Sequence, residues 1–395
     1  MSTAGHAARA HARLSASGSK RWLSCTPSAA LEDSFEESSS SFADEGTAAH
    51  ELSELHLARF LKLIDEETYQ QKLQDFKDTE KYYSQSMDDF VQVYVDIVIE
   101  KINEARARCA DPAVLLEQKL DFSNWVPDGF GTGDVVIVSD GVAEVIDLKF
   151  GKGVPVSAEG NPQMRLYALG AYNLLHFLYE FDTVRMTIVQ PRLDSISTDE
   201  LSVEKLLQWA EEDVKPKALM AEAGEGEYVP GEHCRFCRAR ASCRARARAN
   251  LALARFEFAD PPLLTNEEIA EILKSVDDLK AWASDIAAYA LKQARDHGVK
   301  YAGWKVVEGR SNRKITDELV AADVLLLEGY APELIYKPKE LLGISDLEKA
   351  VGKKKFKELL SDLIIKPAGK PALVPEEDKR VELSSGASAA ADFAD

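Results

Sequence analysis

The strongest constraint in this sequence is a predicted β-hairpin that places two aspartates opposite each other. Asp140-Gly141 separates two runs rich in β-branched residues, and this dipeptide between such runs is the strongest short-range signal for a two-residue turn. Counting outward from that turn pairs Asp134 with Asp147. Directly opposed side chains share a face of the sheet, with Cβ atoms roughly 4.5–5.5 Å apart.

The opposed carboxylates indicate a cation site. Like charges placed there repel each other, whereas a divalent cation between them is coordinated by their hard oxygens. Lys149, two residues after Asp147, points to the same face. Two carboxylates and an ammonium group around a metal form an arrangement that cleaves phosphodiesters. The alternative is an exposed hairpin with solvated charges, although Val136, Val138 and Val145 make its outer face partly apolar.

Composition restricts the class of protein. The 395 residues suit two or three domains, and 45% apolar with 29% charged residues is ordinary for a soluble globular protein. No run of 18 apolar residues exists to span a membrane. The N-terminus lacks an apolar secretory core, so we expect a cytoplasmic location without membrane contact.

Charge is distributed unevenly along the chain. The net charge of −19 argues against a generally basic nucleic-acid binder, but residues 233–256 hold seven arginines and no acid. A local basic surface of this kind can contact phosphates while the rest of the protein repels them. The candidates for DNA contact are Arg235, Arg238 and Arg244. The alternative is a solvated basic helix face.

The pattern of apolar residues predicts a mixed α/β protein. Strands are expected at residues 114–122, 133–138, 142–150 and 184–190, and helices at 46–63, 87–109, 162–178 and 198–214, the last one stopping before Pro216. A shift in composition near residues 258–262 marks a boundary between domains 1–257 and 258–383. The second domain is expected to be mainly α-helical, beginning with a helix from Thr265 to near Gly298. Residues 384–395 are expected to be a disordered tail.

Three closely spaced cysteines, Cys234, Cys237 and Cys243, have the spacing of a ligand cluster. Disulfides are not expected in a cytosolic-type chain with five cysteines. The candidates for a fourth ligand are Cys25, Cys109 and His233. Spacing alone slightly favours Zn²⁺. A 4Fe–4S cluster requires four thiolates, and Cys25 would complete them while joining the N-terminal helix to the end of the first domain. Unconnected buried cysteines are a weaker alternative, because the surroundings are rich in arginine.

The predicted order αβββαβ, with Asp134 on the second strand and Asp147-x-Lys149 on the third, resembles the PD-(D/E)XK nuclease superfamily and its restriction-endonuclease-like fold. It is similar in particular to the RecB-like branch. That branch adds a helix with His before the core, matched by His50 within residues 46–51. It also adds a Gln-x-x-x-Tyr helix, matched by residues 163–167.

Members of that branch with an iron–sulfur cluster place one cysteine before the core and three after it. Cys25 and the three clustered cysteines fit this pattern, so the resemblance covers residues 14 to about 250. It implies that Asp134, Asp147 and the main-chain carbonyl of Leu148 bind Mg²⁺ or Mn²⁺, with His50 as a further ligand. Asp147 stands where many relatives have Glu, a tolerated change.

The resemblance also implies catalytic roles for other residues. Lys149 would orient and help to deprotonate the attacking water or neutralise the charge on phosphorus, while Gln163 and Tyr167 would position Lys149 and the DNA backbone. Glu117 on the first predicted strand would act through a water or a second metal, and the alternative is a surface strand acid. Packing and surface roles are the alternatives for Gln163 and Tyr167.

The whole chain also resembles phage and prophage proteins grouped as domain of unknown function 2800, through residues 14–25, 46–51 and 303–313. We therefore expect a metal-dependent DNA nuclease, most simply an exonuclease that processes DNA ends in phage recombination or replication. The expected partners are DNA and a phage single-strand annealing or replication protein. The alternatives are a non-catalytic DNA-binding scaffold and a zinc-containing DNA-binding module with an unrelated helical domain.

Overall fold

The computed structural model describes residues 12–35, 41–252 and 264–307, together with residues 326, 327, 352 and 355. Residue contacts divide the chain into two units, Met1–Val307 and Glu308–Asp395. The first unit carries the fold described below. The domain boundaries expected after residues 257 and 383 remain predictions, and both fall outside the described residues.

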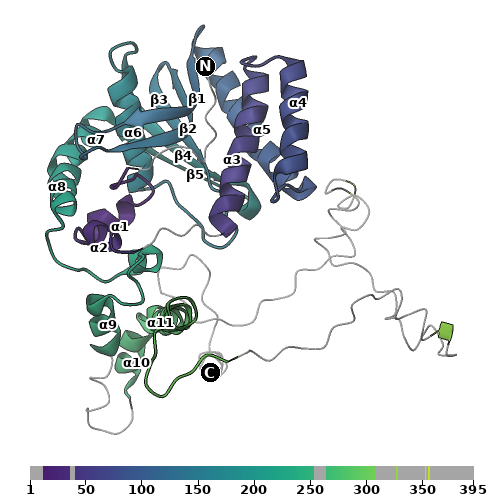
Figure 1. Cartoon of the computed structure of the whole chain (residues 1–395). Helices are drawn as coiled ribbons and strands as arrows, with labels where there is room; N and C mark the ends of the chain where they lie inside the picture. The colour runs from purple at the N-terminus through teal and green to yellow at the C-terminus, as the bar shows by residue number, and fades with distance from the viewer. Residues whose placement is uncertain are drawn as a thin grey trace, which may run out of the picture. The chain divides into compact units, whose positions relative to one another are not determined.

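A five-stranded mixed sheet forms the centre of the first unit (Figure 1). Its strands lie in chain order: β1 (Ala113–Asp121), β2 (Phe130–Ser139), β3 (Gly141–Leu148), β4 (Phe181–Gln190) and β5 (Ser195–Ser202). Neighbouring strands are antiparallel except β3 and β4, which are parallel. Parallel neighbours require a crossover connection, and helix α6 (Pro162–Leu175) supplies it.

The hairpin predicted from Asp140-Gly141 is confirmed. Ser139 pairs with Val142, and both turn residues have positive φ, 50° and 76°. Two successive positive φ values define the type I′ turn, whose twist matches that of the flanking strands. The register runs unbroken from this turn to the pair formed by residues 135 and 146, one step before the predicted pair of residues 134 and 147, and the Leu148 N–H still donates to the Asp134 side chain.

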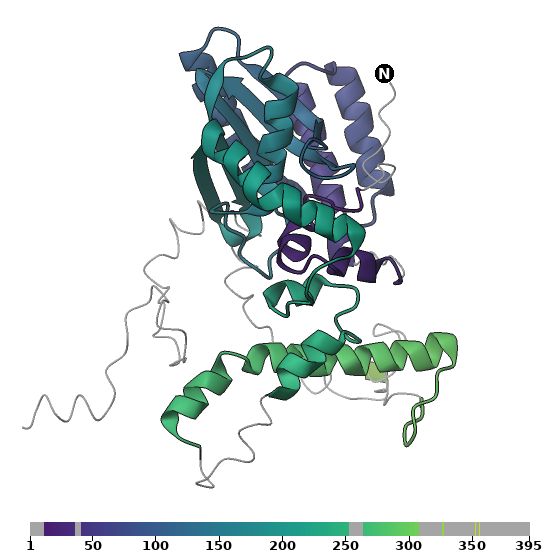
Figure 2. The ribbon, with the colours of Figure 1, turned by 90° about the vertical axis from the view of Figure 1, so that its left-hand side faces the viewer.

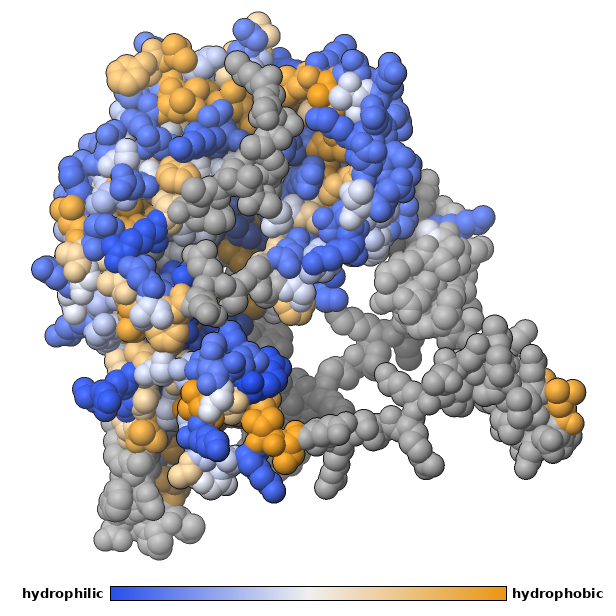
Figure 3. Space-filling view, viewed as in Figure 1, coloured by the Kyte–Doolittle hydropathy of each residue, from blue (hydrophilic) through white to orange (hydrophobic). Residues whose placement is uncertain are grey.

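Helices cover both faces of the sheet (Figure 1). Helix α6 packs on one face in a core that includes Val136, Val145 and Leu169. Helices α3 (Ser41–Phe60) and α5 (Gln85–Arg108) pack on the other face with Val135 and Ile146. Burial of one such aliphatic side chain contributes about 1.5–3 kcal/mol to the free energy of unfolding. Because successive side chains of β2 and β3 point to opposite faces of the sheet, burial on both faces stabilises both helical layers. Hydrophilic side chains cover most of the outer surface of α4 (Glu66–Thr79), which packs on α3 (Figure 3).

Two short helices near the N-terminus pack against residues 215–236, which come late in the first unit. Helices α1 (Ser19–Ser24) and α2 (Ser28–Glu32) pack on α8 (Lys215–Ala223), and α1 also contacts the turn η4 (Glu232–Phe236) (Figure 2). The Thr26 hydroxyl donates to the Glu225 carbonyl at 2.6 Å, and the Arg238 N–H donates to Glu32 at 2.6 Å. Segments about 200 residues apart in sequence are thus joined.

The helix expected over residues 198–214 is wrong at both ends. Residues 195–202 form the edge strand β5, in which every second side chain is exposed, and the Ser202 side chain caps helix α7 (Val203–Trp209). The helical structure does not end before Pro216. A π-helical turn, Ala210–Val214, precedes α8, and Pro216 lies in the first turn of α8, where a missing N–H costs little.

The helix expected from Thr265 to Gly298 consists of two helices, α10 (Asn266–Leu273) and α11 (Val276–His297). Thr265 begins α10 with a capping box, in which its side chain and that of Glu268 each accept from the other residue's N–H. Gly298, in the left-handed conformation, ends α11. None of the residues of α11 is buried, and its Asp278 and Asp285 form ion pairs with Arg246.

Candidate functional site

Acids from three adjacent strands meet at one place on the sheet. Glu117 on β1 lies between the pairs that residues 116 and 118 form with β2, which places it opposite Asp134. Asp147 on β3 follows in the same row. One ligand atom each from His50, Glu117 and Asp134 lies within 4.8 Å of the other two. An imidazole and two carboxylates this close form a group able to hold a metal ion.

His50 brings the helical layer into this group. It lies on α3, and its Nδ1 is 3.1 Å from Oδ1 of Asp134. Burial opposes protonation of the ring, but the negative charges of Asp134, Asp147 and Glu117 outweigh it and raise the pKa of His50 to about 9. In the metal-free protein at neutral pH, His50 is therefore an imidazolium that occupies the place of a cation among the acids.

The two aspartates differ in their partners. Asp134 accepts a hydrogen bond from the main-chain N–H of Leu148 at 2.6 Å. Burial opposes its ionisation, but His50, this N–H and Lys149 together lower the pKa of Asp134. Burial and the charge of Asp134 raise the pKa of Asp147, although Lys149 opposes them. Lys149 lies with its Nζ 2.8 Å from Oδ2 of Asp147, so it is the principal counter-charge of that carboxylate.

Helix α6 presents two polar side chains to the acids. Asn161 caps its N-terminus, and the Gln163 side-chain amide donates to the Tyr167 hydroxyl at 3.1 Å and approaches Oδ1 of Asp147 at 3.5 Å. The Tyr167 ring lies over Gly131 of β2, where a Cβ atom would come within 2.6 Å of it. Glycine at position 131 therefore leaves the space that brings Tyr167 to the sheet. Gln163 and Tyr167, four residues apart on α6, therefore lie on one face of the helix.

The structure brings together most of the residues expected at the metal site. His50 and Asp134 belong to the group that could hold a metal ion. Asp147 is near enough for the charge of Asp134 to act on it, and it also contacts Lys149 and Gln163. Leu148 contributes an N–H to Asp134, while a role for its carbonyl as a metal ligand stays a prediction. Glu117 lies directly in the group, where the sequence had left a surface acid as an alternative.

Glu117 has an unusual backbone. Its φ is 45°, in the left-handed region that residues other than glycine rarely occupy. Its neighbours Leu116 and Gln118 keep regular register with β2, so the distortion is confined to this residue. Local strain of this kind persists where the surrounding structure enforces it, and it concentrates at functional sites.

Tyr94 on α5 is a residue of the site that the sequence did not reveal. Its side chain is fully buried, and its hydroxyl has no hydrogen-bond partner among the described residues. Burial, with added repulsion from Asp134, Asp147 and Glu117, raises the pKa of Tyr94 well above its ordinary value. Tyr94 therefore stays a neutral hydroxyl within the field of the three acids. A tyrosine in an apolar helical stripe carries no signal that separates it from core.

Replacing Tyr94 with phenylalanine is expected to stabilise the metal-free protein by about 1 kcal/mol, because it removes a buried hydroxyl that makes no hydrogen bond. Urea unfolding of the variant measures this change. The matched control is Tyr69→Phe, which removes a hydroxyl bonded to His56 at 2.9 Å and should destabilise the protein. Equal destabilisation by both substitutions would contradict the assignment.

The raised pKa of His50 predicts how the stability of the metal-free protein depends on pH. A folded-state pKa of about 9 against an unfolded value of 6.5 means that this group's contribution is fully present below about pH 6.5 and is lost as pH rises through 9. The loss is at most about 3 kcal/mol. Urea unfolding in the presence of a chelator between pH 6 and pH 9.5 would measure it. In His50→Gln this part of the decline should vanish, and an unchanged pH profile would refute the ion pair.

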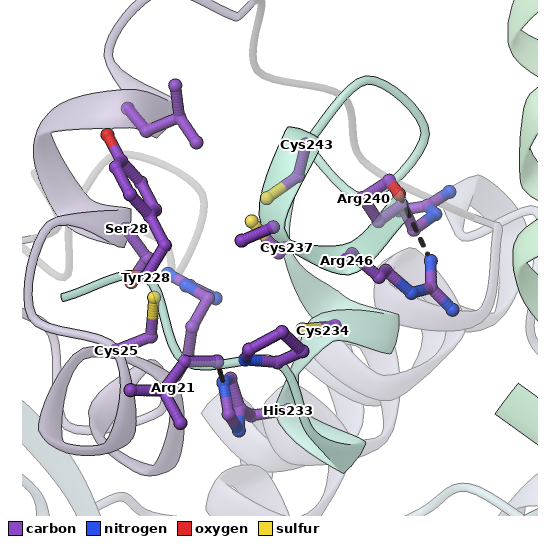
Figure 4. Close-up of a pocket in the computed structure, with 14 residues that line it drawn as sticks. Arg21, Cys25, Ser28, Tyr228, His233, Cys234, Cys237, Arg240, Cys243 and Arg246 are labelled. Atoms are coloured by element: carbon purple, nitrogen blue, oxygen red, sulfur yellow. Dashed lines mark hydrogen bonds between the residues drawn. The ribbon is translucent and has the colours of Figure 1, made fainter. Parts of the chain in front are cut away.

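A second cluster lies apart from the acids, where α1 and α2 meet residues 228–246 (Figure 4). Cys25, Cys234, Cys237 and Cys243 all line one pocket. The first three are buried and Cys243 is half-buried. Burial raises the pKa of Cys25 and of Cys234, and it raises that of Cys237 to about 12. These thiols are therefore protonated at neutral pH unless a metal binds them.

Of the three candidates for a fourth ligand, Cys25 lies with the three clustered cysteines in this pocket. Cys109 follows the end of α5 and is not among the pocket residues. His233 lines the pocket as well, but its Nε2 is 2.9 Å from the Val229 carbonyl. The side chains of Arg235, Arg238 and Arg244 are exposed, as contact with DNA would require, and that role stays a prediction.

A comparison with models of protein families matches almost the whole chain. The model of the family described as protein of unknown function (DUF2800) matches residues 11–381. The chain belongs to this family. A solved structure titled "Crystal structure of SSO0001" matches 50% of this chain and 95% of its own chain, with 13% sequence identity and a TM-score of 0.22. That likeness is too weak to support a conclusion.

Within the part of the chain that the structure describes, no helix is long and apolar enough to cross a membrane.

Proposed function

We propose that this DUF2800 protein is a metal-dependent DNA nuclease of the PD-(D/E)XK type, with the RecB-like additions and a restriction-endonuclease-like core. The observation that carries the proposal is the convergence of Glu117, Asp134, Asp147 and Lys149 from three strands of one sheet. His50 from α3 and Gln163 from α6 approach the same acids from the two helical layers. A row of opposed acids costs stability and is retained where a cation uses it.

The residues divide the chemistry of phosphodiester hydrolysis among them. His50, Glu117 and Asp134 would hold Mg²⁺ or Mn²⁺, and the imidazole favours Mn²⁺. Such a cation polarises a phosphoryl oxygen and activates water for attack. Lys149, held at 2.8 Å by Asp147, places a positive charge where negative charge develops on the phosphate. Gln163 keeps Asp147 and Tyr167 in fixed positions.

We propose that the four pocket cysteines hold a 4Fe–4S cluster rather than a single Zn²⁺. A 4Fe–4S cluster requires four thiolates, and Cys25, Cys234, Cys237 and Cys243 supply four sulfurs in one pocket. The resemblance to the iron–sulfur members of the RecB-like branch favours the cluster over Zn²⁺, because those members also place one cysteine before the core and three after it.

The proposed substrate is DNA, with the exposed Arg235, Arg238 and Arg244 as backbone contacts. The protein as a whole is acidic, with a net charge of −19, so a local basic surface is needed to bring phosphates near. Processing of DNA ends during phage recombination or replication, together with a single-strand annealing or replication protein, is the setting that we propose.

The test is degradation of linear DNA labelled at one end, single-stranded and double-stranded, with Mn²⁺ or Mg²⁺. Wild type is compared with Lys149→Ala, which removes the ammonium group and keeps the acids. Loss of DNA with wild type alone supports the nuclease, and the order of label release gives the polarity. If neither protein degrades DNA while both retain their cluster, the nuclease proposal fails and a DNA-binding scaffold becomes the better interpretation.

A further inference from the structure

Two arginines in the cysteine pocket have a buried N–H group without a partner. Arg246 on α9 (Arg244–Leu251) has a side chain that is 1% exposed, and that of Arg21 on α1 is 19% exposed. Both line the pocket with the four cysteines. The Nε atom of each is buried and makes no hydrogen bond within the described residues. A buried donor left unpaired costs about 1–3 kcal/mol, and more when it is charged.

Other contacts fix both guanidinium groups in place. Arg246 donates to Oδ2 of Asp285 at 2.6 Å and to Oδ1 of Asp278 at 2.9 Å, both on α11, and to the Arg240 carbonyl at 3.2 Å. Arg21 lies 2.6 Å from Oε2 of Glu32. These contacts use the Nη atoms only, so each arginine is anchored at its tip while its Nε–H remains for another acceptor.

Anionic sulfurs in the pocket would offer both donors a charged acceptor. The two arginines line the pocket together with Cys234 and Cys237. Burial raises the pKa of both thiols, while the positive charge of Arg246 opposes this at Cys234 and that of Arg21 opposes it at Cys237. Figure 4 shows the Arg21 side chain extending into the space beside the Cys25 sulfur, with Arg246 on the opposite side of the pocket. Thiolates and sulfides accept hydrogen bonds, and a cluster held by four thiolates carries negative charge that a buried site must balance.

We propose that Arg21 and Arg246 are the charge-compensating, hydrogen-bonding partners of the cluster, and that Arg246 ties the cluster to α11 through Asp278 and Asp285. This inference rests on the iron–sulfur part of the proposed function. The same two acids of α11 are also bonded by Arg240 and Asn250, at 3.0 and 2.9 Å, so Arg246 is one of three described side chains that join α11 to this segment. The charge of the cluster and the attachment of α11 thus depend on the same guanidinium group.

The experiment compares Arg21→Gln and Arg246→Gln with wild type, all purified without oxygen as the full chain. Glutamine keeps polarity and removes the charge. Loss of the positive charge is expected to shift the reduction potential of the cluster to more negative values, since positive charge nearby favours the reduced state. Bleaching of the visible absorbance by a chelator is expected to become about fivefold faster. Arg235→Gln is the matched control, because Arg235 adjoins Cys234 in sequence but is exposed.

The outcomes are distinguishable. If wild type contains no iron, the iron–sulfur proposal fails, and this inference fails with it. If wild type carries the cluster but both variants match Arg235→Gln in potential and bleaching rate, the cluster stands and this inference is overturned. Circular dichroism checks that the variants fold. Should Arg246→Gln not fold, Arg246→Lys keeps the charge without the Nε–H, and Arg21→Gln tests the inference on the less buried side.

Discussion

Replacing Asp147 with alanine is expected to lower DNA cleavage by about 10³-fold or more at saturating Mn²⁺. Asp147 is the carboxylate that holds Lys149 at 2.8 Å and that Gln163 approaches at 3.5 Å. Without it, Lys149 loses the contact that fixes its position, and the row of acids loses one member. Initial rates on end-labelled linear DNA give the size of the effect.

The same substitution is expected to leave the fold intact. Asp147 repels Asp134 and has a raised pKa, so its loss relieves a repulsion while it costs the contact with Lys149. We expect the midpoint of thermal unfolding to change by only a few degrees, since the two effects oppose each other. Asp182→Ala, on the exposed part of β4, is the matched control and should keep full activity. Full activity in Asp147→Ala would refute the proposed site.

The local part of the site was predictable from the sequence because short-range rules fix it. The type I′ turn at Asp140-Gly141 sets the register of the hairpin as far as the pair of residues 135 and 146, and continuing that register predicts that residues 134 and 147 are neighbours. The spacing of Gln163 and Tyr167 on one helix likewise determines that they meet. These inferences needed no knowledge of the rest of the chain.

Long-range features were harder to predict for physical reasons. The position of Glu117 depends on how β1 aligns with β2, which no turn between them fixes at short range. Tyr94 belongs to an apolar helical pattern, and only the packing of α5 on the sheet brings it near the acids. The edge strand β5 alternates in exposure over a short stretch rich in serine, and serine is also typical of the first residues of a helix. Cys25 could be named as the fourth cluster ligand only through the resemblance to the RecB-like branch, because the other three cysteines lie about 200 residues away and no short-range rule links them to it.

Replacing Cys25 with serine is expected to cause the largest loss of stability among the variants considered. Serine is a poor ligand for iron or zinc, so the pocket should lose its metal, and the free energy of metal binding is lost from folding. A loss of roughly 3–5 kcal/mol corresponds to a fall of about 10 °C in the unfolding midpoint of a unit this size. Iron and zinc content, visible absorbance and thermal unfolding together measure it.

Cys109→Ser is the matched control, because Cys109 is a free thiol that does not line the pocket. It should keep both metal and stability. The two effects separate the two sites of the molecule. Cys25→Ser removes the proposed metal ligand that α1 and α2 contribute to the pocket, but it leaves the pairing of β1, β2 and β3 untouched, since none of these strands lines the pocket. A Cys25→Ser protein that keeps its metal and its unfolding midpoint would show that the three clustered cysteines suffice, or that His233 supplies the fourth ligand.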